Sequence, residues 1–129
     1  MPTAVARILR QVMTGVVTKG TARRLTGAFV DAKGVPIEVG GKTGSGDNRY
    51  KTFSKGGGVI SSRPVNRTAA FAFYIGDKYV GVLTASVIGE GAGNYHFTSS
   101  LPVALLRLLA PAIESRLRPI LTLAENPVG

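Results

Sequence analysis

The spacing of apolar side chains predicts an amphipathic helix near the N-terminus, over residues 3–19. Apolar residues recur there at intervals of three and four, as on one face of a helix: Val5, Ile8, Leu9, Val12, Met13, Val16 and Val17. Thr3 is suited to cap the start of this helix and Gly20 its end. Gly15 inside it costs about 1 kcal/mol relative to alanine, so we expect tertiary packing to hold the helix in place.

Two long apolar runs have the character of strands. Residues 68–75 and 79–87 are rich in β-branched and aromatic side chains, and Gly76-Asp77-Lys78 between them predicts a tight hairpin turn. Their near-continuous apolar character indicates that both faces of the sheet are covered. We expect the N- and C-terminal helices to cover one face, and a part of the domain outside this chain to cover the other.

Shorter strands are predicted earlier in the chain. The alternation of apolar and polar residues predicts a strand over about 36–44, and residues 59–62 form a second short candidate. The polar, glycine-rich stretch 50–58 predicts a loop at the mouth of a site.

The C-terminal apolar segment predicts a helix over about 100–117. Ser99 and Ser100 can cap its start, and Pro111 should kink or split it. The tail after Arg118 should be frayed. The predicted apolar stripe consists of Leu101, Leu105, Leu108, Leu109 and Ala112. The chain as a whole is therefore predicted to be α/β (α+β), with an antiparallel sheet flanked by an N- and a C-terminal helix.

Composition narrows the classes of function. A length of 129 residues fits one domain or part of one, and the 44% hydrophobic content is enough for a core. The net charge of +9 favours anionic partners such as nucleic acid, anionic lipid or a substrate with a carboxylate. The absence of cysteine excludes disulfides and thiolate catalysis. The N-terminus lacks the apolar core of a signal peptide, so either the protein is soluble as written or its anchor lies outside this chain.

The stretch with the most distinctive chemistry is Gly40-Gly41-Lys42-Thr43-Gly44-Ser45-Gly46, which follows the predicted strand. It presents an ammonium, hydroxyls and backbone N–H groups, which are donors suited to a carboxylate or an oxyanion. A phosphate-binding P-loop is the competing interpretation. It requires a glycine at position 36, where Pro36 stands, and a helix directly after Thr43, where the sequence Gly-Ser-Gly-Asp-Asn disfavours one.

Residues 41–49, Gly-Lys-Thr-Gly-Ser-Gly-Asp-Asn-Arg, resemble the Lys-Thr-Gly box of bifunctional (class A) penicillin-binding proteins. The segment 12–22 is similar to the helix and Gly-Thr-Ala turn that precede this box, and the later strand pair and C-terminal helix also fit. The resemblance covers about residues 5–118. It implies that residues 1–129 are the C-terminal part of a single transpeptidase domain, with a partial penicillin-binding fold related to serine β-lactamases.

The resemblance also implies a function and roles for single residues. The family carries out D,D-transpeptidation in peptidoglycan crosslinking, so the implied partners are a D-Ala-D-Ala stem peptide and β-lactams. Lys42 and the backbone N–H of Ser45 would be catalytic, the latter as one half of the oxyanion hole. Thr43 would bind the substrate's carboxylate, and Gly44 would let the substrate backbone approach. The residues that follow, Asp47-Asn48-Arg49, match the family pattern without an assigned role.

The nucleophile that this chemistry requires is not in the chain. No serine is followed by lysine three positions later or by asparagine two positions later, so the Ser-x-x-Lys and Ser-x-Asn boxes of the family are absent. Both precede the Lys-Thr-Gly box, so a missing N-terminal part of the domain is a further implied partner. One oxyanion-hole donor typically contributes about 3–4 kcal/mol of transition-state stabilisation. Because half of the hole cannot carry the reaction, we expect the chain to be inactive alone. The parent protein would work at the periplasmic, extracytoplasmic face of the inner membrane.

Two alternatives remain open at this stage, a binding module and a truncated gene product with no function. The chain could be a stand-alone basic binding module for an acidic peptide or nucleic acid, whereas the transpeptidase interpretation expects no nucleic acid partner. A triad of Ser45 or Ser99 with His96 and Asp47 is disfavoured because no nucleophile-elbow motif is present. One histidine and scattered acids, including Glu38 and Glu90, give no metal-ligand spacing, so neither metal nor cofactor is expected.

Overall fold

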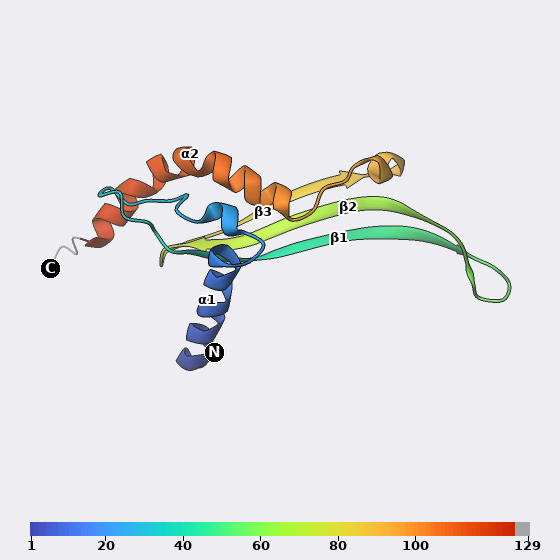
Figure 1. The fold of residues 1–129 in the computed structure, drawn as a ribbon, viewed down its shortest axis with the longest axis horizontal. Coiled ribbons are helices and arrows are strands. Elements are labelled where there is room, and N and C mark those ends of the chain that lie inside the picture. The colour runs from blue at the N-terminus through green and yellow to red at the C-terminus, as the bar shows by residue number, and fades with distance from the viewer. Residues whose placement is uncertain (126–129) are drawn as a thin grey trace.

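The computed structural model describes the backbone of residues 1–125 and the side chains of residues 1–117. It is an α+β fold, in which a three-stranded antiparallel sheet of order β1-β2-β3 carries two long helices (Figure 1). The elements are α1 (Thr3–Thr18), η1 (Arg23–Leu25), β1 (Val39–Phe53), β2 (Val59–Ile75), β3 (Tyr79–Ile88), η2 (Glu90–Asn94) and α2 (Ser100–Glu125). The predicted first helix and the β2–β3 hairpin are confirmed. The hairpin turns at Gly76, whose φ of +59° suits glycine.

The two helices lie on opposite faces of the sheet (Figure 1). Side chains on a strand alternate between faces, so Tyr74 points away from Phe71 and Ile75. The hydroxyl of Tyr74 meets α1, at 2.6 Å from Thr14 Oγ1, whereas Phe71 and Ile75 belong to the core beneath α2. The expectation that both helices cover the same face is therefore wrong.

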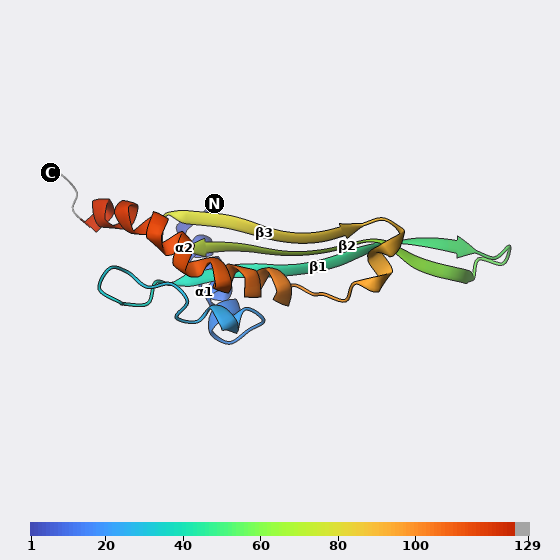
Figure 2. The same cartoon turned by 90° about the horizontal axis from the view of Figure 1, so that it is seen from above.

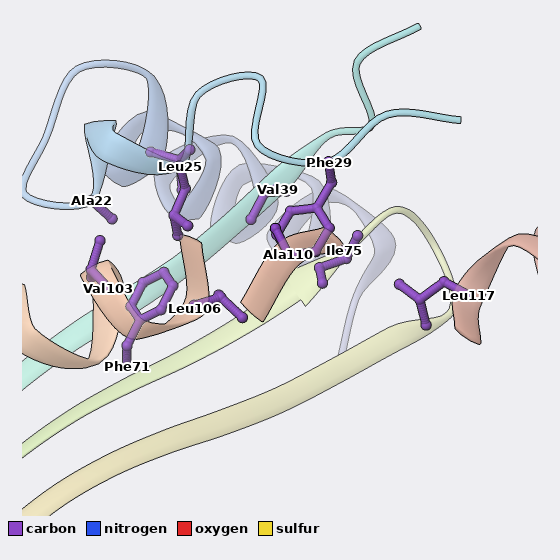
Figure 3. Packing of buried hydrophobic residues seen from close by; sticks show 11 residues of the cluster. Ala22, Leu25, Phe29, Val39, Phe71, Ile75, Val103, Leu106, Ala110 and Leu117 are labelled. Carbon is purple, nitrogen blue, oxygen red and sulfur yellow. The ribbon is translucent and has the colours of Figure 1, made fainter. Parts of the chain in front are cut away.

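The core lies between β2 and α2, and Figure 3 shows its packing. Phe71 and Ile75 of β2 pack with Val103, Leu106 and Ala110 of α2, all of which are buried. Leu25 of η1 and Phe29 of the following loop close one side of this cluster. Helix α2 is the main cover of this face, because its side chains fill the core there. Burial of a side chain the size of leucine contributes about 1.5–3 kcal/mol to stability.

The predicted stripe on α2 is offset from the face that is buried. The helix packs through Val103, Leu106 and Ala110, whereas Leu108 is 77% exposed and Leu105 and Leu109 are also exposed. The reason is that α2 is apolar on nearly all sides, so periodicity alone does not select the buried face.

Helix α2 is also longer and more continuous than predicted. It continues through Pro111 as one helix, curving over the sheet, and its backbone extends to Glu125 rather than fraying after Arg118 (Figure 1). Pro111 removes one backbone donor and its ring crowds the carbonyl of Arg107, a cost that a long helix with a packed face can absorb. Residues 126–129 lie outside the described part of the chain.

Helix caps also differ from the prediction. Pro2, not Thr3, is the N-cap of α1, and it has no side-chain cap. At the other end, Lys19 is the C-cap, and a Cβ on Gly20 would lie 2.9 Å from the Val16 backbone. Gly20 is therefore required for close approach rather than for a left-handed turn.

The face of the sheet that carries α1 is largely open. On β3, Val80 is 87% exposed and Val82 is 64% exposed. Helix α1 covers only one end of this face, and the predicted apolar stripe of its first three turns, including Ile8 and Val12, is itself exposed. Within the described residues nothing else covers this face, and the expectation that a part of the domain outside this chain covers it stays a prediction.

Strands β1 and β2 extend well beyond β3 as a two-stranded arm (Figure 2). The strand predicted over 36–44 begins at Val39 and ends at Phe53, and the predicted loop over 50–58 is only a turn after it. The cause is pairing: Tyr50–Phe53 align with the first residues of β2, so their backbone groups join a ladder. Gly57, with φ +84°, closes the turn.

Candidate functional site

The Lys-Thr-Gly box lies within β1, which is an edge strand of the described sheet. The Gly76 N–H donates to the Glu38 carbonyl and the Asn48 N–H donates to Asn66 Oδ1, each at 2.8 Å. Even-numbered residues of β1 therefore direct their backbone groups toward β2. Because backbone direction alternates along a strand, the N–H and C=O of Thr43 and Ser45 point toward the open edge.

The side chains of the box converge on that edge. Lys42 is exposed, and its Nζ donates to the Thr43 carbonyl oxygen at 2.5 Å. The Thr43 hydroxyl lies 3.0 Å from that of Thr21, in the turn after α1. No acidic side chain pairs with Lys42 among residues 1–117. The Lys42 ammonium, the Thr43 hydroxyl and the outward-pointing N–H groups of β1 therefore lie along one edge. All of them are hydrogen-bond donors that suit an anion.

The Ser45 side chain has a structural contact of its own. Its Oγ accepts a hydrogen bond from the Ser99 N–H at 2.9 Å, while the Ser100 N–H donates to Thr98 Oγ1 at 3.3 Å. The predicted capping of α2 by Ser99 or Ser100 is therefore replaced by Ser45 and Thr98. This contact holds the start of α2 against the box strand.

The glycines of the box fall into two groups. A Cβ on Gly40 would lie 2.5 Å from the Tyr74 ring, and one on Gly41 would lie 2.7 Å from the Phe71 ring. A Cβ on Gly44 would meet nothing within 4 Å. The first two allow the strand to pack tightly, whereas Gly44 leaves open space beside Thr43.

A polar network anchors the start of β1 to α1. Arg10 Nε donates to Glu38 Oε1 at 2.7 Å, its Nη1 pairs with Asp77 at 2.9 Å, and its guanidinium lies 4.7 Å above the Tyr74 ring. The Tyr74 hydroxyl lies 2.6 Å from Thr14 Oγ1 and 3.0 Å from Glu38 Oε1. Glu38 thus has a structural role in this network, and Glu90 pairs with Arg63 at 3.0 Å.

Two groups in this network have shifted pKa values. The hydrogen bond to Glu38 raises the pKa of the Arg10 guanidinium, so Arg10 stays charged. Burial raises the pKa of the Tyr74 phenol above 10.0; the contact with Thr14 acts in the opposite direction, and the Glu38 carboxylate raises it further. Tyr74 is therefore a neutral hydrogen-bonding group in the folded protein.

A hollow of about 200 Å³ adjoins the box on the α2 side of β1. Its lining comes from β1, β2 and the segment before α2: Ser45, Gly46, Asp47, Arg67, Thr68, Phe97 and Thr98. The Asp47 carboxylate pairs with Arg49 at 2.9 Å, which gives these two residues a structural role. Sequence analysis missed Arg67, whose buried Nε has no hydrogen-bond partner within the described residues. Only the pairing of Arg67 with Asp47 across two strands brings it here, so no sequence motif could have indicated it.

The geometry excludes two competing interpretations. Gly41, Lys42 and Thr43 lie in a strand that continues to Phe53, so no helix N-terminus follows as a P-loop requires. His96 is exposed, and within the described side chains no hydrogen bond joins it to Ser45, Ser99 or Asp47. The triad that the sequence disfavoured is therefore not assembled in the described residues. The described residues also contain no cluster of three potential metal ligands.

Comparison with known proteins adds no assignment. No protein-family model matches this chain, and no curated protein is significantly similar to it. Among the described helices, none is both long and apolar enough to cross a bilayer.

Proposed function

We propose that this chain is the C-terminal part of a penicillin-binding D,D-transpeptidase domain and supplies its Lys-Thr-Gly strand. One observation carries the proposal: the box lies on an open sheet edge, toward which Ser45 directs its N–H and where the Lys42 ammonium bonds the Thr43 carbonyl. That is the arrangement of donors that an acyl-transfer site needs on one side of its substrate.

The open face of the sheet supports the idea of a missing partner segment. Val80 and Val82 on β3 and the exposed stripe of α1 leave apolar side chains uncovered on one face of the sheet, and Lys42, in register with Ala72 and Val82, lies on that same face. A partner that covered this surface would sit beside the box and could bring a nucleophile to it. In this proposal that partner is the N-terminal part of the same domain, with the Ser-x-x-Lys and Ser-x-Asn boxes.

The proposed chemistry divides between the two parts. The serine of the partner attacks the carbonyl carbon between the two D-alanines, and the carbonyl oxygen becomes an oxyanion that accepts a hydrogen bond from the Ser45 N–H. Collapse of this intermediate breaks the peptide bond, and the amine of the leaving D-alanine takes the proton that the serine hydroxyl released. The resulting ester then passes its acyl group to an amine. Until the D-alanine leaves, Lys42 and the Thr43 hydroxyl hold its terminal carboxylate, an interaction made stronger by charge.

The test is intact-mass spectrometry after incubation with a labelled penicillin. The chain is measured alone and mixed with a separately produced N-terminal segment that carries Ser-x-x-Lys, after assembly has been shown by size-exclusion chromatography. The expected result is no adduct on the isolated chain and one adduct on the added segment in the mixture. A stoichiometric adduct on the isolated chain would place the nucleophile here, with Ser45 as the first residue to test. An assembled mixture without an adduct would favour a binding module instead.

A further inference from the structure

The arm formed by residues 49–64 carries apolar side chains that nothing in the described structure covers. It begins where β1 and β2 leave β3 behind, since β3 pairs with β2 only from Asn66 to Ile75 (Figure 2). Near its tip, Phe53 is 58% exposed and Ile60 is 67% exposed, and Val59 is exposed as well. Three large apolar side chains are thus held away from the core at the end of a narrow ribbon.

Register places part of this apolar tip on the same side as basic residues. Phe53 pairs with Val59, so the two side chains share a face. Lys51 precedes Phe53 by two residues and therefore lies on that face too, as does Arg49. A register shift between Thr52 and Phe53 leaves Ile60 as the extra residue of a bulge at the tip.

The charge of the arm has one sign. Residues 49–64 contain four basic residues (Arg49, Lys51, Lys55 and Arg63) and no acidic one. Arg49 and Arg63 pair with Asp47 and Glu90, which lie outside the arm. Lys51 and Lys55 make no ion pair with any described residue, so the charge next to the apolar tip is uncompensated.

We infer that this arm binds the surface of an anionic lipid bilayer. An apolar tip beside unpaired lysines matches the two layers of such a surface, because the apolar groups enter the boundary of the acyl chains while the ammonium groups remain among the phosphates. The arm would lie along the interface, where water and headgroups still bond its open strand edges. Lys55, in the turn, can reach headgroup level through its flexible stem.

Two other partners fit these residues less well. Single-stranded nucleic acid stacks successive bases on aromatic rings, but the guanidinium of Arg63 lies 5.6 Å over the Tyr50 ring, which leaves Phe53 as the one uncovered ring of the arm. A second copy of the chain would bring two arms of the same charge together, which opposes association.

The inference is tested with the full chain and a single tryptophan. The chain contains no tryptophan, so Phe53→Trp places a unique fluorophore at the tip. The probe is a set of phosphatidylcholine vesicles with or without phosphatidylglycerol. We expect a blue shift and quenching by brominated lipid only with anionic vesicles, and weaker binding at higher salt. Replacing Lys51 and Lys55 with serine should weaken binding about fivefold for each lysine.

Matched variants of the otherwise native chain identify the surface, with binding measured by co-sedimentation and folding by circular dichroism. Ile60→Ser should lower vesicle affinity about tenfold, whereas Ile8→Ser, at a comparably exposed site on α1, should leave it unchanged. If Ile8→Ser abolishes binding and Ile60→Ser does not, the bilayer surface is on α1 and the inference is overturned. Binding to duplex or single-stranded DNA without binding to anionic vesicles would overturn it too, as would a shift of the tryptophan spectrum that depends on protein concentration alone.

Discussion

The phenol ring of Tyr74 occupies the space that a side chain at position 40 would need. A Cβ on Gly40 would lie 2.5 Å from Tyr74 Cε1 and from its hydroxyl oxygen. The ring cannot move aside freely, because its hydroxyl is hydrogen-bonded to Thr14 Oγ1 and Glu38 Oε1 and its face contacts the Arg10 guanidinium. This packing fixes the strand that carries Lys42 against α1.

The first prediction follows from that contact. Gly40→Ala should destabilise the protein by about 1–3 kcal/mol, the usual cost of overpacking. Gly44→Ala is the matched control, because Gly44 is on the same face of β1 and has open space around it; its effect should be within about 0.5 kcal/mol. Urea denaturation followed by circular dichroism measures both. Equal losses for the two variants would contradict the packing argument.

The raised pKa of Tyr74 predicts a loss of stability at alkaline pH. The unfolded chain releases the Tyr74 proton near pH 10, whereas the folded protein retains it. Between these two pKa values the folded state binds more protons, so the free energy of unfolding falls as the pH rises. Tyr74→Phe should remove this component, and Tyr50→Phe, at an exposed ring, should retain it. Denaturation midpoints at a series of alkaline pH values provide the measurement.

The Ser45–Ser99 hydrogen bond predicts a local effect on α2. Ser45→Ala removes the acceptor for the Ser99 N–H, so unfolding should become easier by about 0.5–1.5 kcal/mol. Amide hydrogen exchange should accelerate specifically at Ser99, whereas a general loss of stability would accelerate exchange at many amides. Ser86→Ala, at an exposed hydroxyl on β3, is the control and should change neither quantity. Protection of the Ser99 amide that is unchanged in Ser45→Ala would refute the contact.

Lys42 should matter for chemistry and not for folding. Its side chain is exposed, so Lys42→Met should change the free energy of unfolding by less than about 0.5 kcal/mol. In the reconstituted mixture with the N-terminal segment, the same substitution should slow acylation by penicillin on the order of 100-fold, an effect typical of losing one preorganised donor. Lys78→Met, in the β2–β3 turn, is the matched control. Acylation at the native rate in Lys42→Met would show that Lys42 has no role in this reaction.

The proposed function predicts that the N-terminal segment binds the open face of β3. Val82→Asp should leave the isolated chain folded, because Val82 is already 64% exposed, yet it should weaken assembly with the N-terminal segment at least about tenfold. Leu108→Asp introduces the same charge at an exposed site on α2, on the opposite face, and should not affect assembly. Size-exclusion chromatography and titration calorimetry measure the affinity. The reverse pattern would move the docking surface to α2.

Local pattern was sufficient for several elements of this protein. The three- and four-residue spacing before Gly20 predicted α1, and Gly76-Asp77-Lys78 between two apolar runs predicted the β2–β3 hairpin; both are confirmed. These features depend on neighbours in sequence, namely helical periodicity and the conformational freedom of glycine in a turn. The Lys-Thr-Gly box was likewise visible in the sequence, and the function it implies stays a prediction.

Tertiary structure decided what depends on distant residues. Pairing with β2 extended β1 from the predicted end near Gly44 to Phe53, because a strand continues as long as a partner satisfies its backbone. Packing chose Leu106 over Leu108 as the buried face of α2, a choice that a helix with apolar residues all around cannot encode by spacing. The sheet also separated α1 from α2, since Tyr74 and Ile75 point to opposite faces. Adjacent positions in sequence thus came to serve two different surfaces, and only the assembled sheet determines which of them a partner can reach.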